Sequence, residues 1–255
     1  MNELTQIPDN YKAQKNCLKD KIILVTGAGD GIGAVAAKTF AEYGATVILL
    51  GKTIPKLEKV YDEIVNANFP QPAIIPLDLA AATTDQYAEL AQKIEQEFDH
   101  LDGLLHNAAM FGGLIPITQF DLPQWEQITK INLQAPFLLS QTLIPLLNKS
   151  KESSMVFTSS SVAHHGQAYW GAYGVTKAAQ DNLMGILADE LEINSPIRVN
   201  SIDPGRVRTR MRALAFPGED PNTVPKPEDV MNAYLYLMSS DSKDINGQII
   251  IAKEK

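Results

Sequence analysis

Short apolar runs alternate with longer amphipathic stretches along almost the whole chain. Such runs are typical of strands buried on both faces, as in a parallel sheet. They lie at Lys21–Thr26, Thr46–Leu50, Ala73–Leu77, Leu101–His106, Met155–Thr158, Ile197–Ile202 and Gln248–Ile251. Helix-like stretches separate them, at Gly33–Tyr43, Ile54–Ala67, Asp85–Phe98, Leu133–Leu147, Tyr173–Leu191 and Asp229–Met238. This alternation predicts an α/β fold in which helices cover both faces of a parallel sheet of about seven strands.

The chain length of 255 residues suits one doubly wound domain. No linker or internal repeat divides the chain, so we predict a single Rossmann-type domain over residues 21–255. Residues 1–20 are predicted to be a polar extension, which can pack on the domain or on a partner subunit. The segment 206–226 contains Pro217, Pro221 and Pro225, and we predict an irregular lid there.

Charge and composition exclude several classes of partner. The formal net charge of −8 repels phosphate backbones and anionic headgroups, so we expect no nucleic acid and no membrane partner. The single cysteine, Cys17, has no partner for an internal disulfide, which fits a reducing compartment. The start lacks the order of a secretory signal, and no apolar run is long enough to span a bilayer. We therefore predict a cytoplasmic protein.

A glycine-rich turn follows the first predicted strand directly. Its residues are Thr26, Gly27, Ala28, Gly29, Asp30, Gly31, Ile32 and Gly33. Glycines remove the Cβ atoms that would keep backbone N–H groups and a helix N-terminus away from a pyrophosphate. The spacing G-x-x-x-G-x-G differs from the commoner G-x-G-x-x-G, and a turn without a ligand is the alternative. The position at the end of a strand favours a dinucleotide.

The end of the second predicted strand bears on the choice of dinucleotide. NAD-binding proteins usually place an Asp or Glu there, on the ribose diol. This strand ends in Leu50, Gly51 and Lys52, so no carboxylate is present and Lys52 offers a cation to a 2′-phosphate. We predict a preference for NADP(H), with NAD(H) as the alternative. The alternative is that Lys52 only interacts with solvent at the start of the next helix, and it would then indicate no preference between NADP(H) and NAD(H).

Tyr173 and Lys177 are four residues apart and would share one face of a helix. A neighbouring ammonium favours the phenolate, so we expect Lys177 to lower the Tyr173 pKa and make it a usable acid or base. A serine of the run 159–161 could hold the reacting oxygen. Taken alone, the pair is more often an ordinary amphipathic helix surface.

Taken together, these segments resemble the short-chain dehydrogenase/reductase family, in order and spacing from residue 21 to about residue 251. The matching pieces are the turn 26–33, His106-Asn107-Ala108-Ala109, Asn132, the serine run, Tyr173-x-x-x-Lys177 and Asp203-Pro204-Gly205. More narrowly, LVTGAGDGIG, TVILLGK and VFTSSSVAHHGQAYWGAY are similar to the bacterial YciK-type branch, whose substrates are poorly defined. The resemblance implies hydride transfer between a nicotinamide and an alcohol or carbonyl compound, without a metal.

The resemblance also implies the roles of the catalytic residues. Tyr173 would be the general acid in reduction and the general base in oxidation. Lys177 would lower the pKa of Tyr173 and bind the nicotinamide ribose. Asn132 would kink its helix and hold a water of the proton path through its backbone carbonyl. Ser161 is our preferred serine because it precedes Val162-Ala163, whereas Ser160 has the commoner spacing to Tyr173.

Further cofactor contacts are implied in the same way. Asp78 would contact the adenine, and Asn107 with Ala108 would steady the strand beside it. Pro204 and Gly205 would flank the nicotinamide, with Thr209 reaching its amide.

Three departures from the family pattern stand out. His106 and Ala109 replace the usual asparagine and glycine, and the D-G-G sequence that usually follows the last strand is absent before residues 252–255. We expect retuned packing at His106 and a changed C-terminal subunit contact.

Weaker features have plain interpretations. His164 and His165 are predicted to be loop histidines near the substrate entrance, since no metal-ligand spacing accompanies them. The predicted lid contains four arginines, Arg206, Arg208, Arg210 and Arg212, which could attract an anionic substrate. We favour the alternative that this loop is solvated and that Glu219 and Asp220 balance its charge. The apolar stretch Leu133–Leu147 and the resemblance predict a homodimer or homotetramer.

We therefore predict an NAD(P)(H)-dependent oxidoreductase acting on a small alcohol or carbonyl substrate, with NADPH-dependent carbonyl reduction as the favoured reaction. The alternative is a catalytically silent dinucleotide-binding regulatory protein, against which the presence of Tyr173, Lys177, Asn132 and the serines argues. A nucleotide-sugar epimerase is disfavoured because the chain lacks a longer C-terminal substrate domain.

Overall fold

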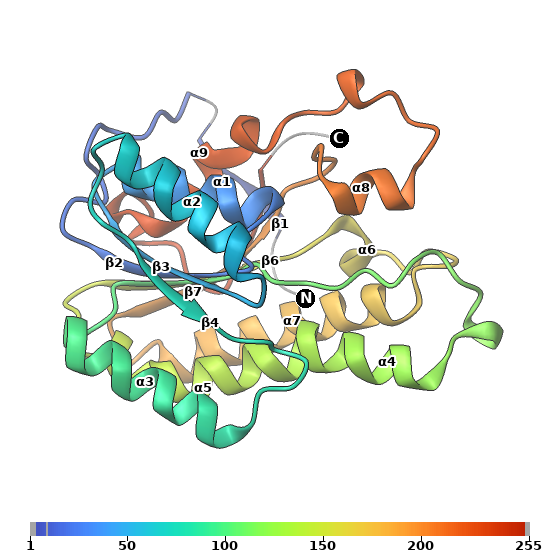
Figure 1. The fold of residues 1–255 in the computed structure, drawn as a ribbon, viewed down its shortest axis with the longest axis horizontal. Coiled ribbons are helices and arrows are strands. Elements are labelled where there is room, and N and C mark those ends of the chain that lie inside the picture. The colour runs from blue at the N-terminus through green and yellow to red at the C-terminus, as the bar shows by residue number, and fades with distance from the viewer. Residues whose placement is uncertain (1–3, 9, 253–255) are drawn as a thin grey trace.

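One parallel sheet runs through the computed structural model, which describes residues 4–8 and 10–252 (Figure 1). Its eight strands have the order β1-β8-β7-β6-β5-β2-β3-β4. They are β1 Leu4–Gln6, β2 Ile22–Thr26, β3 Thr46–Gly51, β4 Ala73–Pro76, β5 Gly103–His106, β6 Ser153–Thr158, β7 Ile197–Asp203 and β8 Ile249–Ile251. All seven predicted strands are present, which confirms the doubly wound α/β fold.

Helices cover both faces of this sheet, as predicted. In Figure 1, α1, α2 and α9 lie above the sheet, and α3, α5 and α7 lie below it. The helices are α1 Gly31–Glu42, α2 Ile54–Asn66, α3 Thr84–Phe98, α4 Leu122–Thr129, α5 Ala135–Leu147, α6 Ser161–His164, α7 Gly171–Leu191, α8 Arg210–Ala215 and α9 Met231–Met238. Within residues 4–8 and 10–252, no helix has the length and apolarity that a bilayer span requires.

Two apolar cores lie on opposite faces of the sheet, because successive side chains of a strand point to opposite sides. Ile23 and Val25 of β2 belong to the core formed with α1, α2 and α9. Leu24, between them, belongs to the core formed with α3, α5 and α7. This burial on both faces explains why the strands read as continuous apolar runs rather than as alternating ones.

Several helices begin where the sequence supplies a cap. The Asp30 carboxylate accepts a hydrogen bond from the Gly31 N–H, at 2.8 Å, at the start of α1. Thr83 and Gln86 form a reciprocal capping box at the start of α3. The cap at Asp30 fixes the N-terminus of α1 directly after the glycine-rich turn.

The N-terminal residues contribute a strand that the sequence pattern does not predict. Residues 4–6 form β1, which pairs in parallel with residues 249–251 of β8. The Tyr11 ring then packs edge to face on Tyr236, at 4.9 Å between ring centroids, and its hydroxyl donates to Asp241 at 2.8 Å. The sheet therefore has eight strands rather than about seven. Residues 1–3 and 9 of the predicted extension, and 253–255 of the C-terminal tail, lie outside the described residues.

The segment 206–226 is more regular than we expected. It contains α8, whose first turn is capped because the Thr209 hydroxyl accepts from the Arg212 N–H at 3.2 Å. A 3-10 turn follows at Pro221–Thr223. The Arg208 N–H donates to the Pro225 carbonyl at 2.7 Å, which ties the two ends of the segment together. The prolines therefore limit regular structure here without preventing it.

Candidate active site

Most of the predicted site residues gather at the carboxyl edge of the sheet. The glycine-rich turn follows β2, Lys52 follows β3, Asp78 lies just beyond β4, Asn107 follows β5, Ser160 follows β6, and Pro204 follows β7. The strand order reverses between β2 and β5, because β3 and β4 lie on one side of β2 while β5 and β6 lie on the other. Ligands of doubly wound folds bind at such a switch point.

Thr26 joins the ends of β2 and β5 at this switch point. Its hydroxyl donates to the Leu105 carbonyl at 3.2 Å and accepts from the N–H groups of Asn107 and Ala108 at 2.9 and 3.0 Å. The Asn107 side-chain amide donates to the Thr26 carbonyl at 3.2 Å. Asn107 and Ala108 are therefore held next to the glycine-rich turn.

Glycine is required at both ends of that turn. Gly27 has a φ of +67°, in the left-handed region that favours glycine. A Cβ at Gly33 would stand 2.4 Å from the Gly27 carbonyl oxygen and from the Asn107 amide nitrogen. Between them, Ile32 packs against the core under α1. The turn thus brings bare backbone to the N-terminus of α1, which fits the pyrophosphate of a dinucleotide.

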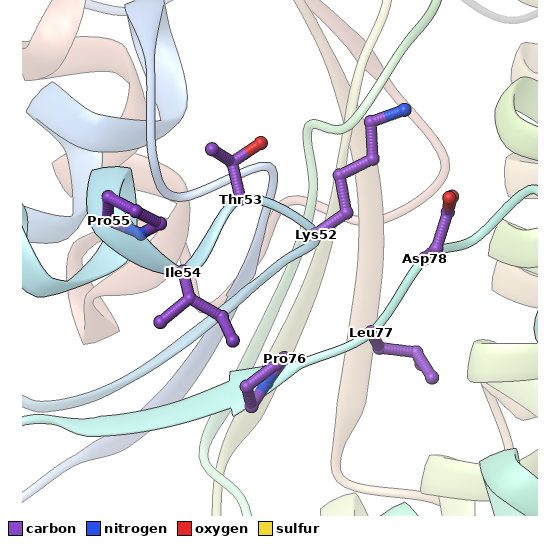
Figure 2. Close-up of a pocket in the computed structure, with 7 residues that line it drawn as sticks. All are labelled: Lys52, Thr53, Ile54, Pro55, Pro76, Leu77 and Asp78. Carbon is purple, nitrogen blue, oxygen red and sulfur yellow. The ribbon is translucent and has the colours of Figure 1, made fainter.

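An open hollow of about 570 Å³ lies between the ends of β3 and β4. It is lined by Lys52, Thr53, Ile54, Pro55, Pro76, Leu77 and Asp78. Figure 2 shows the side chains of Lys52 and Asp78 extending to the same side of the hollow, while Ile54 and Pro76 form its apolar floor. The volume is within the range of small-molecule sites, and the arrangement fits the adenosine half of a dinucleotide.

A second cation, Lys56, lies near this hollow and was missed by the sequence analysis. Its ammonium donates to the Asp30 carboxylate at 2.5 Å. This hydrogen bond, with help from the Gly31 N–H and the charges of Lys56 and Arg210, holds the pKa of Asp30 below its ordinary value. Asp30 is therefore an ionised but neutralised carboxylate. No spacing in the sequence indicates that Lys56 folds back onto the turn.

Tyr173 and Lys177 lie one turn apart on α7, and both side chains are buried. The Lys177 ammonium is 5.9 Å from the centre of the Tyr173 ring. The Ser160 side chain interacts with Tyr173 and favours its ionised form. Our preference for Ser161 stays a prediction. Ser160 precedes α6 in an extended conformation, whereas Ser161 is the first residue of that helix. The two neighbouring serines therefore differ in backbone conformation.

Burial dominates the pKa values of this pair. It raises the pKa of Tyr173 to about 12, although the interaction with Ser160 opposes the rise. It lowers the pKa of Lys177 to about 8, although the Asp181 carboxylate opposes the fall. The net shift of the Tyr173 pKa is therefore upward, opposite to the direction that we expected from Lys177 alone. Desolvation of the phenolate outweighs the attraction of a nearby ammonium.

Lys177 contacts groups that the sequence analysis did not identify. Its ammonium donates to the Thr158 carbonyl at 2.5 Å and to the Gln180 side-chain oxygen at 3.0 Å. Asp181, beside it, accepts from the hydroxyls of Ser159 and Ser201 at 2.5 and 2.7 Å. Gln180 and Asp181 follow Lys177 by three and four residues, so helical spacing alone could have suggested them.

Asn132 lies in a π-helical segment, Lys130–Gln134, between α4 and α5. The side chain is completely buried; its oxygen accepts from the Met110 N–H at 2.8 Å, and its amide donates to the Met110 carbonyl and the Thr176 hydroxyl. A π-bulge shifts the backbone hydrogen bonds of a helix by one residue and often marks a functional site. The local distortion agrees with the kink that the resemblance implies.

The segment after β7 folds back toward the glycine-rich turn. The Asp203 carboxylate accepts from the Gly205 N–H at 2.9 Å, which places Pro204 inside a tight turn. Thr209 lies so close to Gly31 that a Cβ there would stand 3.5 Å from the threonine methyl group. Pro204, Gly205 and Thr209 are thus brought to the same side as the turn, although the Thr209 hydroxyl is engaged as the cap of α8.

His106 is buried at the end of β5, where the family usually has asparagine. Its Nε2 lies 2.9 Å from the Ser140 hydroxyl, and its ring stacks on Phe157 at 4.5 Å. Burial, and to a lesser degree the charge of Lys177, lowers the pKa of His106 to about 3. His106 is therefore a neutral packing residue, as the substitution suggested.

His164 is not the loop residue that we expected. It ends α6, where its two ring nitrogens lie 3.8 Å from the carboxylates of Asp181 and Asp203. His165, next to it, is exposed. Over residues 4–8 and 10–252, no group of three or more histidine, cysteine or acidic side chains is arranged to hold a metal ion.

The parallel sheet with its glycine-rich turn at the switch point defines a Rossmann-like protein. The model of the short chain dehydrogenase family matches residues 21–220, and the chain belongs to that family of oxidoreductases.

Relatives agree over nearly the full length. The uncharacterized oxidoreductase YciK of Escherichia coli is 46% identical over 244 residues, which cover 96% of each chain. A short chain dehydrogenase from Shigella flexneri, solved in complex with NADP, is 46% identical with a TM-score of 0.92, over 94% of this chain and 100% of that one. One from Escherichia coli CFT073, complexed with NADPH, has the same identity and coverages and a TM-score of 0.91.

Proposed function

We propose that this protein is an NADP(H)-dependent oxidoreductase that reduces a carbonyl group to an alcohol. The observation that carries the proposal is the buried Tyr173, which interacts with Ser160 and lies one helical turn from Lys177. A nicotinamide, when bound, supplies the hydride. The protein must then orient the carbonyl and deliver a proton to its oxygen.

Tyr173 is the proton donor in this mechanism. With a pKa of about 12, its hydroxyl is protonated at neutral pH, which suits reduction better than oxidation. Ser160 holds the same oxygen by a second hydrogen bond. Lys177 stabilises the tyrosinate that remains and binds the nicotinamide ribose, while Asn132 positions the distorted helix beside it.

The cofactor is held along the carboxyl edge of the sheet. The residues are Gly27, Gly29, Asp30, Gly31, Ile32 and Gly33 at the pyrophosphate, Lys52 and Asp78 at the adenosine, Asn107 and Ala108 beside them, and Pro204, Gly205 and Thr209 at the nicotinamide. The segment 206–226 acts as the lid over the substrate. The NADP and NADPH complexes of relatives support the preference for the phosphorylated cofactor.

The reaction is tested by NADPH consumption with a panel of aldehydes, ketones and quinones. Turnover by the wild type, lowered by at least about 10²-fold in Tyr173→Phe, supports the proposal, because the variant keeps the ring and loses only the proton donor. Tight NADPH binding without turnover of any panel member would favour the regulatory alternative instead.

The cofactor preference is tested by calorimetric titration with NADPH and NADH. Lys52→Ala should weaken NADPH binding at least about tenfold while leaving NADH binding nearly unchanged, because only NADPH carries the 2′-phosphate. Lys59→Ala, at an exposed lysine that pairs with Glu63 on α2, is the matched control. Tighter binding of NADH than of NADPH to the wild type contradicts the preference.

We further infer a cytoplasmic homodimer or homotetramer with one catalytic domain over residues 21–255. The described helices carry exposed apolar side chains at Phe137 on α5 and at Val175 and Ile186 on α7, each about half exposed. A subunit contact would cover them. Light scattering that gives the mass of a single chain would contradict the assembly.

A further inference from the structure

A third apolar cluster, separate from the two cores of the sheet, surrounds Tyr173. Its buried members are Phe111, Val162, Tyr173 and Ala215, and its partly buried members are Ala109, Trp170, Met211 and Phe216. They come from the loop after β5, from α6, from the start of α7 and from α8 with its C-terminal neighbour. The proposed proton donor is thus enclosed by apolar groups from four parts of the chain.

Aromatic rings form the largest part of this cluster. Phe111 meets Tyr173 edge to face at 5.8 Å and Trp170 at 5.2 Å between ring centroids. Trp170 lies 5.7 Å from Tyr173 and 6.2 Å from Phe216. Trp170 and Phe216 keep part of their surface in solvent, so one side of the cluster can be reached from outside.

The charges on α8 do not turn this cluster into an anion site. The Arg212 guanidinium lies over the Phe216 ring at 3.7 Å, and it binds both carboxylate oxygens of Glu219 at 2.7 Å. Arg206 also faces Glu219, at 3.9 Å. Arg210 lies near enough to Asp30 to lower its pKa, on the side of the glycine-rich turn. Arg212 therefore adds to the surface formed by the aromatic rings, and Glu219 neutralises its charge.

We propose that the substrate is a carbonyl compound whose carbonyl group carries an apolar, preferably aromatic, substituent, and that Phe111, Trp170 and Phe216 bind this substituent. The proposal rests on the proposed reduction at Tyr173. The carbonyl oxygen lies at Tyr173 and Ser160, while the rest of the molecule is removed from water against the rings. An ionised group in this place loses its hydration without gaining a partner.

The first test compares benzaldehyde with 4-carboxybenzaldehyde as substrates for reduction by NADPH. The two differ by one carboxylate, and we expect kcat/KM to be at least about tenfold higher for benzaldehyde. Equal or higher kcat/KM for the carboxylate overturns the proposal and directs attention to Arg208, whose buried Nε has no hydrogen-bond partner among the described residues.

Two side-chain variants test whether Phe216 binds the apolar substituent of the substrate. Phe216→Leu keeps an apolar side chain but removes the ring, and we expect it to raise KM for benzaldehyde several-fold more than it lowers kcat. Phe98→Leu, at the partly buried last residue of α3, is the matched control for a phenylalanine lost elsewhere. An equal effect of the two variants on KM would count against the proposal.

A binding measurement separates this proposal from the proposed reaction. The chain has two tryptophans, Trp125 and Trp170, so Trp125→Phe leaves Trp170 as the only indole reporter. With NADP bound, benzyl alcohol should change the Trp170 emission saturably, and 4-(hydroxymethyl)benzoate should not. This response without any turnover would support the apolar site while the proposed reaction fails. No response to benzyl alcohol would overturn the site even if turnover is found.

Discussion

Ser160 and Ser161, near Tyr173, show that two adjacent residues of the same type can have different surroundings. Ser160 and Ser161 are adjacent, yet Ser160 lies in extended backbone beside the Tyr173 hydroxyl while Ser161 begins α6. At the residue scale, the proposed chemistry therefore depends on where one short helix begins.

The two serines should differ sharply in activity. We expect Ser160→Ala to lower kcat for carbonyl reduction by about 10²-fold, because a hydrogen bond to the reacting oxygen is lost. Ser161→Ala should change kcat by less than about threefold. Steady-state kinetics with NADPH checks both variants, and a larger loss in Ser161→Ala would identify Ser161 as the catalytic serine.

Lys177 sets an expected pH limit on the reaction. Burial lowers its pKa to about 8, so the ammonium that Tyr173 requires is lost as the pH rises through 8. The logarithm of kcat/KM for reduction should then fall by about one for each pH unit above that value.

Asp181 supplies the control for this pH limit. Its carboxylate raises the pKa of Lys177, so Asp181→Asn should move the alkaline fall to lower pH. The asparagine keeps one acceptor oxygen for one of the two serine hydroxyls, and its amide can donate to the oxygen of the other hydroxyl. A fall at the same pH in both proteins would mean that another group titrates.

At the scale of elements, β1 protects an edge of the sheet, a role that its sequence does not indicate. It pairs with β8 over three residues and its Thr5 hydroxyl donates to the Gln248 side chain at 2.9 Å. β1 therefore covers the edge that β8 would otherwise expose, which is a common way to protect a sheet.

Removal of residues 2–8 should lower stability without unfolding the domain. We expect a loss of about 1–2 kcal/mol from the missing backbone hydrogen bonds, which corresponds to a fall in Tm of roughly 2–8 °C for a chain of this size. Tyr11→Phe, which removes only the hydrogen bond to Asp241, should lower Tm by less than about 2 °C. Thermal denaturation checks both; an unchanged Tm after the deletion would show that β1 contributes no stability.

At the scale of the whole molecule, a neutral histidine in the core couples stability to pH. The folded-state pKa of His106 is about 3, whereas an exposed histidine in the unfolded chain has a pKa near 6.5. Between these values the unfolded state binds one more proton, so the free energy of unfolding falls as the pH falls below 6.5.

His106→Asn should remove this dependence. From pH 6.5 to pH 5 the wild type should lose about 2 kcal/mol through His106, at about 1.4 kcal/mol per pH unit, and the variant should lack that loss. Urea denaturation at pH 7 and pH 5 measures the difference, and His165→Asn, at an exposed histidine, is the control. An equal loss of stability in wild type and His106→Asn contradicts the assignment.

The sheet, the helices and the glycine-rich turn could be predicted from the sequence alone, because buried strands and amphipathic helices have periodic patterns of apolar residues. The sequence placed Tyr173 and Lys177 on one helix face for the same reason. β1 escaped prediction because three residues with one strong apolar side chain carry no such pattern, and only pairing with β8 makes them a strand.

The contacts between residues distant in the sequence follow from the tertiary structure alone. It brought Lys56 to Asp30 and gathered Phe111, Trp170 and Phe216 around Tyr173. It also reversed the expected direction of the Tyr173 pKa shift. Burial depends on what packs against a side chain from other elements, and the spacing of residues along the chain does not contain that information.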